Sequence, residues 1–86
     1  MTKSVHTKDY DLFLDLLVKA RKDASMTQAE VASKLRRPQS YVSKYESGER
    51  RLDVVEFLDL ARVIGFDPAR LIKNLYRESM GQPPEL

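Results

Sequence analysis

Apolar side chains recur at spacings of three and four residues along most of the chain, and no stretch alternates between apolar and polar positions as a half-buried strand does. The segment 9–24, DYDLFLDLLVKARKDA, shows this spacing clearly and places its apolar side chains on one face of an amphipathic helix. The members of this face are Tyr10, Phe13, Leu14, Leu17, Ala20 and Ala24. The pattern predicts a long first helix and favours an all-α chain.

Two capping boxes mark the starts of later helices. Thr27 is followed three residues on by Glu30, and Asp53 is followed at the same spacing by Glu56. In such a pair each side chain accepts a hydrogen bond from the backbone N–H of the other residue. The helices predicted in this way span residues 27–35 and 54–65.

Proline and glycine mark the remaining boundaries. Pro38 suits the first turn of a third helix, where a missing N–H costs nothing, and Gly48 is placed to end that helix. Gly65 is placed to end the fourth helix. Asp67 and Pro68 open a fifth helix over ARLIKNLY, residues 69–76.

Five short helices joined by tight turns predict a compact all-α domain, because they leave no room for long loops. We expect this single domain to span residues 9–77 of the 86, with flexible tails over 1–8 and 78–86. The sequence has no cysteine, no signal-peptide core and no apolar run near the roughly 20 residues of a membrane span. These features predict a cytoplasmic protein that has no membrane partner.

Positive charge is concentrated in residues 36–51, RRPQSYVSKYESGERR. Five cations face two carboxylates there, so the stretch carries +3 while the rest of the chain sums to −1. A basic stretch on a nearly neutral chain favours a local anionic partner. A solvated loop explains the same charges equally well, so charge alone decides nothing.

The second and third helices form an informative pair. Each spans only about two to three turns, which is too short for a stable helix in water, so both must pack against other helices. About three residues, 35–37, connect them. A connection this short forces a sharp angle between the two helices, which is the geometry of a helix-turn-helix.

The third helix has two separate faces on a helical wheel. One face carries an amide, hydroxyls and an ammonium, the groups that bond base edges and phosphates in a major groove, and the other face suits a core. The polar face consists of Gln39, Ser40, Ser43 and Lys44, at about 0–140°, and the apolar face of Tyr41, Val42 and Tyr45, at about 200–300°. Polar faces are common on surface helices, so the wheel alone permits nucleic-acid binding without establishing it.

The segment TQAEVASKL…PQSYVSKYESGERRLDVVEFLDLARVIGFDP resembles the Cro and lambda-repressor type of helix-turn-helix, also called the Xre family. The similarity runs from about Leu17 to Leu75. The matching positions are Thr27, Gln28, Ala32, Ser40, Val42, Ser43, Tyr45, Glu46, Gly48 and Arg51. The resemblance implies a compact five-helix, lambda-repressor-like DNA-binding domain with the helix-turn-helix at helices two and three.

The resemblance also implies roles on DNA. Gln39 matches the position whose amide bonds an adenine edge, and Gln28 matches the residue that touches the DNA backbone and braces that glutamine. With the two other family positions that face bases, the predicted base-reading residues are Gln39, Ser40 and Lys44. Together with the nearby cations and hydroxyls, the predicted DNA-backbone contacts are Gln28, Arg36, Arg37, Ser43, Ser47 and Arg51.

Other polar residues are better explained by structure than by chemistry. Family members often join a charge pair across the domain at the positions of Arg21 and Glu46. Tyr41 and Tyr45 lie on the apolar side of the wheel, so we expect them to pack in the core rather than stack on nucleotides. His6 lies in a tail, where we expect an unengaged side chain.

The sequence departs from the family in the turn. The residue after Leu35 is commonly a glycine in a left-handed conformation, and here it is Arg36, at a cost of about 1 kcal/mol if the conformation is kept. Either the turn differs slightly, or the strain is tolerated because Arg36 gains a phosphate contact. Pro38 replaces the hydroxyl residue that often caps the third helix, so one possible backbone contact is missing.

Together with the polar face of the third helix, the resemblance implies a small transcriptional regulator, a repressor or autoregulator, that binds double-stranded DNA sequence-specifically. One recognition helix reads too few base pairs for a unique site, so we expect a homodimer on a palindromic operator, with two recognition helices about 34 Å apart. The fifth helix and the turn before it offer apolar surface for this pairing. The predicted interface residues are Phe66, Leu71, Ile72, Leu75 and Tyr76.

Two other classes of function compete with DNA binding. An enzyme would need a nucleophile with its base, a phosphate-binding glycine loop or a cluster of metal ligands. The sequence shows none of these, so we expect no catalysis, no metal and no cofactor. A protein-interaction module that uses the same fold without specific DNA binding stays open, because a basic helix also suits an acidic protein partner.

Overall fold

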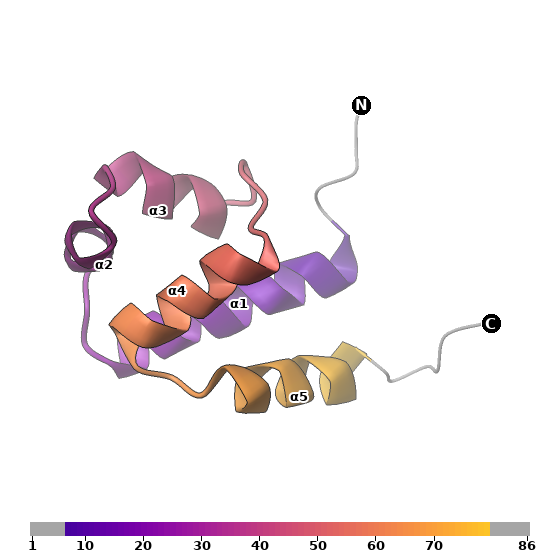
Figure 1. The fold of residues 1–86 in the computed structure, drawn as a ribbon. Helices are drawn as coiled ribbons and strands as arrows, with labels where there is room; N and C mark the ends of the chain where they lie inside the picture. The colour runs from indigo at the N-terminus through magenta and orange to yellow at the C-terminus, as the bar shows by residue number, and fades with distance from the viewer. Residues whose placement is uncertain (1–6, 80–86) are drawn as a thin grey trace.

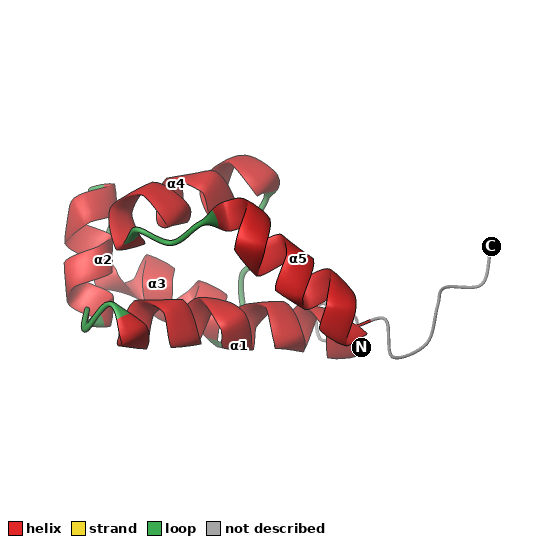
Figure 2. Cartoon of the chain, turned by 90° about the horizontal axis from the view of Figure 1, so that it is seen from below, coloured by secondary structure: helices red, strands yellow, loops and turns green. Residues whose placement is uncertain are grey.

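The computed structural model describes residues 7–79, which form five α-helices and no strand (Figures 1 and 2). The helices are α1 (Lys8–Asp23), α2 (Gln28–Leu35), α3 (Gln39–Glu46), α4 (Val54–Ile64) and α5 (Pro68–Ser79). The predicted all-α class and the order of the five helices are confirmed.

α1 begins one residue before the predicted start of the domain, and α5 ends two residues after its predicted end. Lys8 begins α1, because the Thr7 hydroxyl caps that helix by accepting the Tyr10 N–H at 3.0 Å. Glu78 and Ser79 end α5 rather than lying in a tail. Residues 1–6 and 80–86, with the expectation for His6, lie outside the described part of the chain.

Both predicted capping boxes are confirmed. The Thr27 hydroxyl accepts the Glu30 N–H at 3.0 Å, and the Glu30 carboxylate accepts the Thr27 N–H at 2.8 Å. The same exchange joins Asp53 and Glu56 at 2.7 and 3.0 Å. These bonds satisfy backbone donors that a helix start leaves unpaired.

The ends of the helices follow the predicted proline and glycine signals with one correction. Gly65 ends α4 with φ 93°, a left-handed conformation that glycine adopts without strain. Pro38 is the residue before α3 rather than part of its first turn, because its ψ of 153° is extended, and no side chain caps this helix start.

The helices are arranged so that α3 and α5 lie on opposite sides of the molecule, with α1 and α4 between them (Figure 1). In that view α2 is seen nearly end-on while α3 lies across the picture, so the two helices cross steeply. Leu17, Val31, Val42, Tyr45 and Leu60, from four different helices, form the fully buried centre. Burying a side chain of this size contributes about 1.5–3 kcal/mol, so helices as short as α2 and α3 are held by the shared core.

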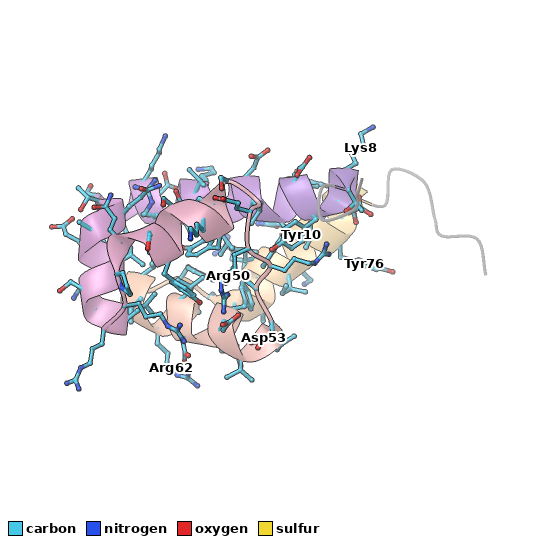
Figure 3. The ribbon with its side chains drawn as sticks, turned by 90° about the horizontal axis from the view of Figure 1, so that it is seen from above. Lys8, Tyr10, Arg50, Asp53, Arg62 and Tyr76 are labelled. Carbon is cyan, nitrogen blue, oxygen red and sulfur yellow. The ribbon has the colours of Figure 1, made fainter. Side chains whose placement is uncertain are left out.

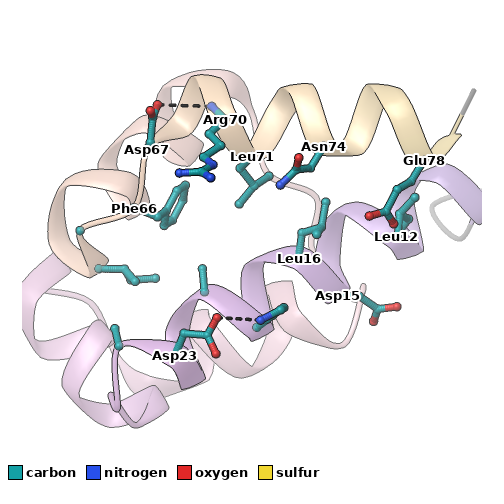
Figure 4. Close-up of a pocket in the computed structure, with 15 residues that line it drawn as sticks. Leu12, Asp15, Leu16, Asp23, Phe66, Asp67, Arg70, Leu71, Asn74 and Glu78 are labelled. Carbon is teal, nitrogen blue, oxygen red and sulfur yellow. Dashed lines mark hydrogen bonds and ion pairs between the residues drawn. The ribbon is translucent and has the colours of Figure 1, made fainter.

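A hollow of about 850 Å³ opens between α1 and α5 (Figure 4). In Figure 1, α5 lies on the opposite side of the molecule from α3. The lining of the hollow includes Leu16 and Phe66 as well as several carboxylates. Two of these carboxylates are engaged: Asp67 accepts N–H bonds from the first turn of α5, and Asp23 pairs with Lys19 at 2.8 Å. None of the helices in residues 7–79 combines the length and apolar character needed to cross a membrane.

Candidate nucleic-acid interface

The turn between α2 and α3 consists of residues 36–38. Arg36 adopts a left-handed conformation, with φ 60° and ψ 44°. The turn therefore keeps the backbone conformation for which a glycine is common at this position. The Arg36 N–H donates to the Ser33 carbonyl at 3.0 Å, and the Arg37 N–H donates to the Ala32 carbonyl at 2.9 Å. These bonds close the end of α2 and turn the chain sharply into α3.

The two faces of α3 are separated as the wheel predicts. Tyr41, Val42 and Tyr45 are buried, with the two rings 5.8 Å apart, so their predicted core packing is confirmed. On the other face Gln39, Ser40 and Lys44 are exposed and Ser43 is half-buried. The exposed face therefore presents an amide, a hydroxyl and an ammonium.

A chain of hydrogen bonds runs from the end of α1 to the first residue of α3. Arg21 pairs with Glu46 through two contacts, Nε to Oε2 at 2.7 Å and Nη2 to Oε1 at 3.1 Å. Gln28 Nε2 donates to the same Glu46 Oε1 at 2.8 Å, and Gln39 Nε2 donates to Gln28 Oε1 at 3.5 Å. The expected charge pair and the expected brace between the two glutamines are both present.

The Arg21–Glu46 pair is shielded from water, with side chains 11% and 7% exposed. Arg21 also donates to the Met26 carbonyl at 2.9 Å, which ties the α1–α2 connection to the pair. The hydrogen bond to Glu46 raises the pKa of Arg21, against the opposing effect of burial. The pair therefore joins α1, α2 and α3 at the base of the exposed helix.

A second cluster holds the arginines that flank α3. The guanidinium carbons of Arg37 and Arg50 lie 4.4 and 4.8 Å from the centre of the Tyr41 ring. Arg50 also pairs with Glu56 through bonds of 2.7 and 3.1 Å. The bond from Arg50 lowers the pKa of Glu56, and the Asp53 backbone N–H adds to this effect. The ring thus helps to order Arg37 and adds a contact to Arg50, which Glu56 already holds.

The loop after α3 is fastened to α1. The Leu52 N–H donates to the Tyr10 hydroxyl at 3.1 Å, and the Arg51 guanidinium lies 4.3 Å from the centre of the Tyr10 ring. Figure 3 looks onto α3 and shows Tyr10 beside this loop and Arg50 between α3 and α4. Gly48, φ 85°, makes the first bend of the loop.

The comparisons with known proteins agree with this geometry. Residues 13–71 match the family described as helix-turn-helix domain. A solved structure of an XRE-family like protein from Pseudomonas syringae pv. tomato str. DC3000 is 52% identical, with a TM-score of 0.79 over 83% of this chain and 87% of that one. This chain belongs to the XRE family of helix-turn-helix proteins. No curated protein sequence matches it. XRE-family proteins are DNA-binding regulators and are not typically enzymes, so the chain is a DNA-binding regulator.

The XRE fold places the predicted DNA-facing residues at the start of α2, along α3 and in the segments that flank α3. Arg36 and Arg37 precede α3, the three predicted base-reading residues lie along it, and Ser47 and Arg51 follow it. Ser43 Oγ donates to the Ser40 carbonyl at 3.2 Å, and Ser47 Oγ donates to the Lys44 carbonyl at 3.1 Å. The residues for which the sequence predicts these DNA contacts are Gln28, Arg36, Arg37, Gln39, Ser40, Ser43, Lys44, Ser47 and Arg51.

Sequence reasoning missed three residues that shape this XRE surface, namely Tyr10, Arg50 and Glu56. Arg50 was counted only as a charge and Glu56 only as a helix cap, although a cation six residues before a capping carboxylate is a usable signal. The Tyr10–Leu52 bond joins residues 42 positions apart, so no local pattern announces it.

The predicted dimer surface needs a correction. Leu71 is 7% exposed and belongs to the core, and Phe66 is half-buried with its ring 5.7 Å from that of Phe57. Leu71 faces the other helices because its side of α5 is the one that packs on them, so it is not available to a second chain. Ile72 and Tyr76, 44% and 65% exposed, lie on the accessible side, and Leu75 is half-buried.

Proposed function

We propose that this XRE-family protein is a sequence-specific transcriptional regulator, a repressor or autoregulator, that inserts α3 into the major groove of double-stranded DNA. The observation that carries the proposal is the exposed row on α3, where Gln39, Ser40 and Lys44 stand clear of the core while Tyr41 and Tyr45 anchor the helix. Amides, hydroxyls and ammonium groups are the side chains that bond base edges.

Binding divides between phosphates and bases. Arg36, Arg37 and Arg51 supply charge at the two ends of α3, and each phosphate contact adds roughly −0.9 to the slope of log K against log salt. Gln28, Ser43 and Ser47 add backbone bonds that set the position of the helix on the duplex. The base-reading residues supply discrimination of about 1–3 kcal/mol for each good contact.

Homodimerisation is part of the proposal, because a single α3 reads too few base pairs to define a unique operator. The accessible apolar groove on α4 and α5 is lined by Phe57, Pro68, Ala69, Ile72, Lys73 and Tyr76. A two-fold contact through Ile72 and Tyr76 would make this surface self-complementary, as in most small homodimers. The matching operator is a palindrome with half-sites about 10 base pairs apart.

The dimer is tested by sedimentation or gel filtration with Ile72→Asp, beside Val55→Asp as a control at an exposed valine outside the groove. We expect the wild type and Val55→Asp to be dimeric and Ile72→Asp to be monomeric. A monomeric wild type at high protein concentration contradicts this part of the proposal.

Specific binding is tested by selection from randomised duplex DNA at about 0.15 M salt, near physiological ionic strength. Gln39→Ala is run in parallel, with Ser33→Ala as a control on the exposed side of α2. We expect the wild type and Ser33→Ala to enrich one palindrome, and Gln39→Ala to relax the preference at one position of each half-site. Absence of enrichment by the wild type contradicts the proposal.

A protein-docking role that uses the same basic face without specific DNA binding is the second candidate, because the exposed Lys44 and the flanking arginines also suit an acidic protein partner. Lys44→Glu, compared with Lys22→Glu on α1, separates the two functions. Loss of salt-sensitive DNA binding in Lys44→Glu alone supports the DNA-binding role. Equal and negligible DNA affinity in the wild type and both variants contradicts the DNA-binding role and leaves docking as the remaining candidate.

A further inference from the structure

Glu46 holds two donors from different helices on one carboxylate. Its Oε1 accepts from Arg21 Nη2 at 3.1 Å and from Gln28 Nε2 at 2.8 Å, while Oε2 accepts from Arg21 Nε at 2.7 Å. A carboxylate only accepts hydrogen bonds, so Gln28 must turn its NH₂ group toward Glu46. The Gln28 carbonyl oxygen is thereby directed away from the carboxylate.

The same argument applies to Gln39, the next residue in this series of hydrogen bonds. Gln28 Oε1 only accepts, so Gln39 must turn an N–H toward it, and the structure has this contact at 3.5 Å. An amide has two N–H groups. When the one trans to the carbonyl oxygen is directed inward to Gln28, the oxygen and the remaining N–H stand side by side on the outward edge.

That outward edge matches one purine and rejects the other. Adenine offers an N6 donor and an N7 acceptor in the major groove, which pair with an amide oxygen and N–H. Guanine offers two acceptors there, O6 and N7. When Gln39 is held in this orientation, its amide oxygen faces a guanine acceptor, and two acceptors repel each other. A Gln39 amide that turns freely can direct its NH₂ group to guanine instead.

We propose that Glu46, whose side chain is 7% exposed and does not contact DNA itself, is the positioning residue that makes Gln39 select adenine over guanine. This inference rests on the DNA-binding function proposed above. Arg21 holds the Glu46 carboxylate in place, and Glu46 sets the orientation of the Gln28 amide. Gln28 in turn sets the orientation of the Gln39 amide, which faces the base.

Two variants break the relay at different points. Gln28→Met removes the amide link and leaves the Arg21–Glu46 pair intact. Glu46→Gln replaces the carboxylate with a group that both donates and accepts, so Gln28 can be held in either orientation. Ser33→Ala, on the exposed side of α2, is the control. Thermal unfolding of each variant identifies any that fail to fold, and Gln28→Met keeps the test available if Glu46→Gln is one of them.

The readout is the ratio of adenine to guanine affinity at the operator position that Gln39→Ala relaxes. Loss of a phosphate contact by Gln28 weakens binding to both bases and cancels in this ratio. We expect the ratio to fall by about fivefold or more in Gln28→Met and in folded Glu46→Gln, as the loss of one base contact predicts. A purely structural role for Glu46 would lower the unfolding temperature and leave the ratio unchanged.

The free protein provides a second readout that needs no DNA. In ¹⁵N–¹H spectra the two side-chain N–H signals of Gln39 should be distinct from those of a free glutamine in the wild type and move toward them in Gln28→Met. The inference is overturned if folded variants bind DNA with a ratio within about twofold of the wild type, below the roughly fivefold worth of one contact. A wild type that selects no DNA sequence overturns the proposed function, whatever the spectra show. The inference about Glu46 then fails as well, because it rests on that function.

Discussion

Replacement of Arg36 by glycine should stabilise the fold and weaken DNA binding at the same time. Arg36 has φ 60° and ψ 44°, and its guanidinium has no hydrogen-bond or ion-pair partner within residues 7–79. The left-handed conformation costs a non-glycine residue about 1–2 kcal/mol. Glycine removes this strain but gains about 0.5–1 kcal/mol of unfolded-chain entropy. When the lower ends and the upper ends of these two ranges are each subtracted, the net expectation is a gain of about 0.5–1 kcal/mol.

Ser25 offers a matched control. It is the other described non-glycine residue with positive φ, 58°, and it lies in the α1–α2 connection, away from α3. Ser25→Gly should therefore give a similar gain in stability without a change in DNA binding. For a domain of this size the gain corresponds to a rise of about 2–8 °C in unfolding temperature, which circular dichroism resolves.

DNA affinity is then measured by fluorescence anisotropy over a range of salt concentrations. If Arg36 contacts a phosphate, Arg36→Gly should make the slope of log K against log salt shallower by roughly 0.9 than in Ser25→Gly. A lower unfolding temperature in Arg36→Gly but not in Ser25→Gly would refute the strain argument. Equal salt slopes in the two variants would refute the phosphate contact.

Three further predictions concern stability. Gly65→Ala should cost about 1–2 kcal/mol by urea denaturation, from backbone strain at φ 93° alone, because a Cβ there meets no atom within 4 Å; an unchanged midpoint would refute this. Tyr45→Phe should raise stability by about 0.5–1 kcal/mol, since the buried hydroxyl has no described hydrogen-bond partner. Burial raises the pKa of Tyr45, so the unfolded chain loses this proton more readily than the folded one, and the wild type should lose stability above about pH 10. Tyr45→Phe should lose less stability over the same range. Equal losses in the two proteins would show that Tyr45 is not the cause. Arg50 is the main cause that lowers the pKa of Glu56 in the fold, so Glu56→Gln should be less stable than the wild type at pH 7. The difference should shrink as the pH falls below 4.5, the ordinary value, and disappear below the lowered pKa of the folded state. A difference that stays constant in acid would show that the charge of Glu56 is not its cause.

Local signals sufficed for the helices because capping is decided within four residues. The pairs Thr27–Glu30 and Asp53–Glu56 supply their own hydrogen-bond partners, so sequence alone located the starts of α2 and α4. The predicted place of Pro38 in the first turn of α3 was wrong, since its extended ψ places it just before the helix and no side chain caps this start.

The polar face of α3 was also readable from the sequence, because helical periodicity assigns each side chain to a face. The partners of those side chains were not readable. The bond between Leu52 and Tyr10 and the stacking of Arg37 and Arg50 on Tyr41 depend on how α1, α3 and α4 are brought together. Leu71 shows the same limit, since its burial depends on which side of α5 meets the core.

The sequence by itself therefore determined the five helices, the sharp turn between α2 and α3, and the set of side chains that α3 exposes, since these follow from interactions within one or two turns. Only the tertiary structure decided which of those side chains are held in place. The order along Arg21, Glu46, Gln28 and Gln39 arises because three helices converge on one shielded carboxylate. A carboxylate that only accepts hydrogen bonds gives the relay its direction, and the packing of the helices brings that carboxylate within reach of Gln28.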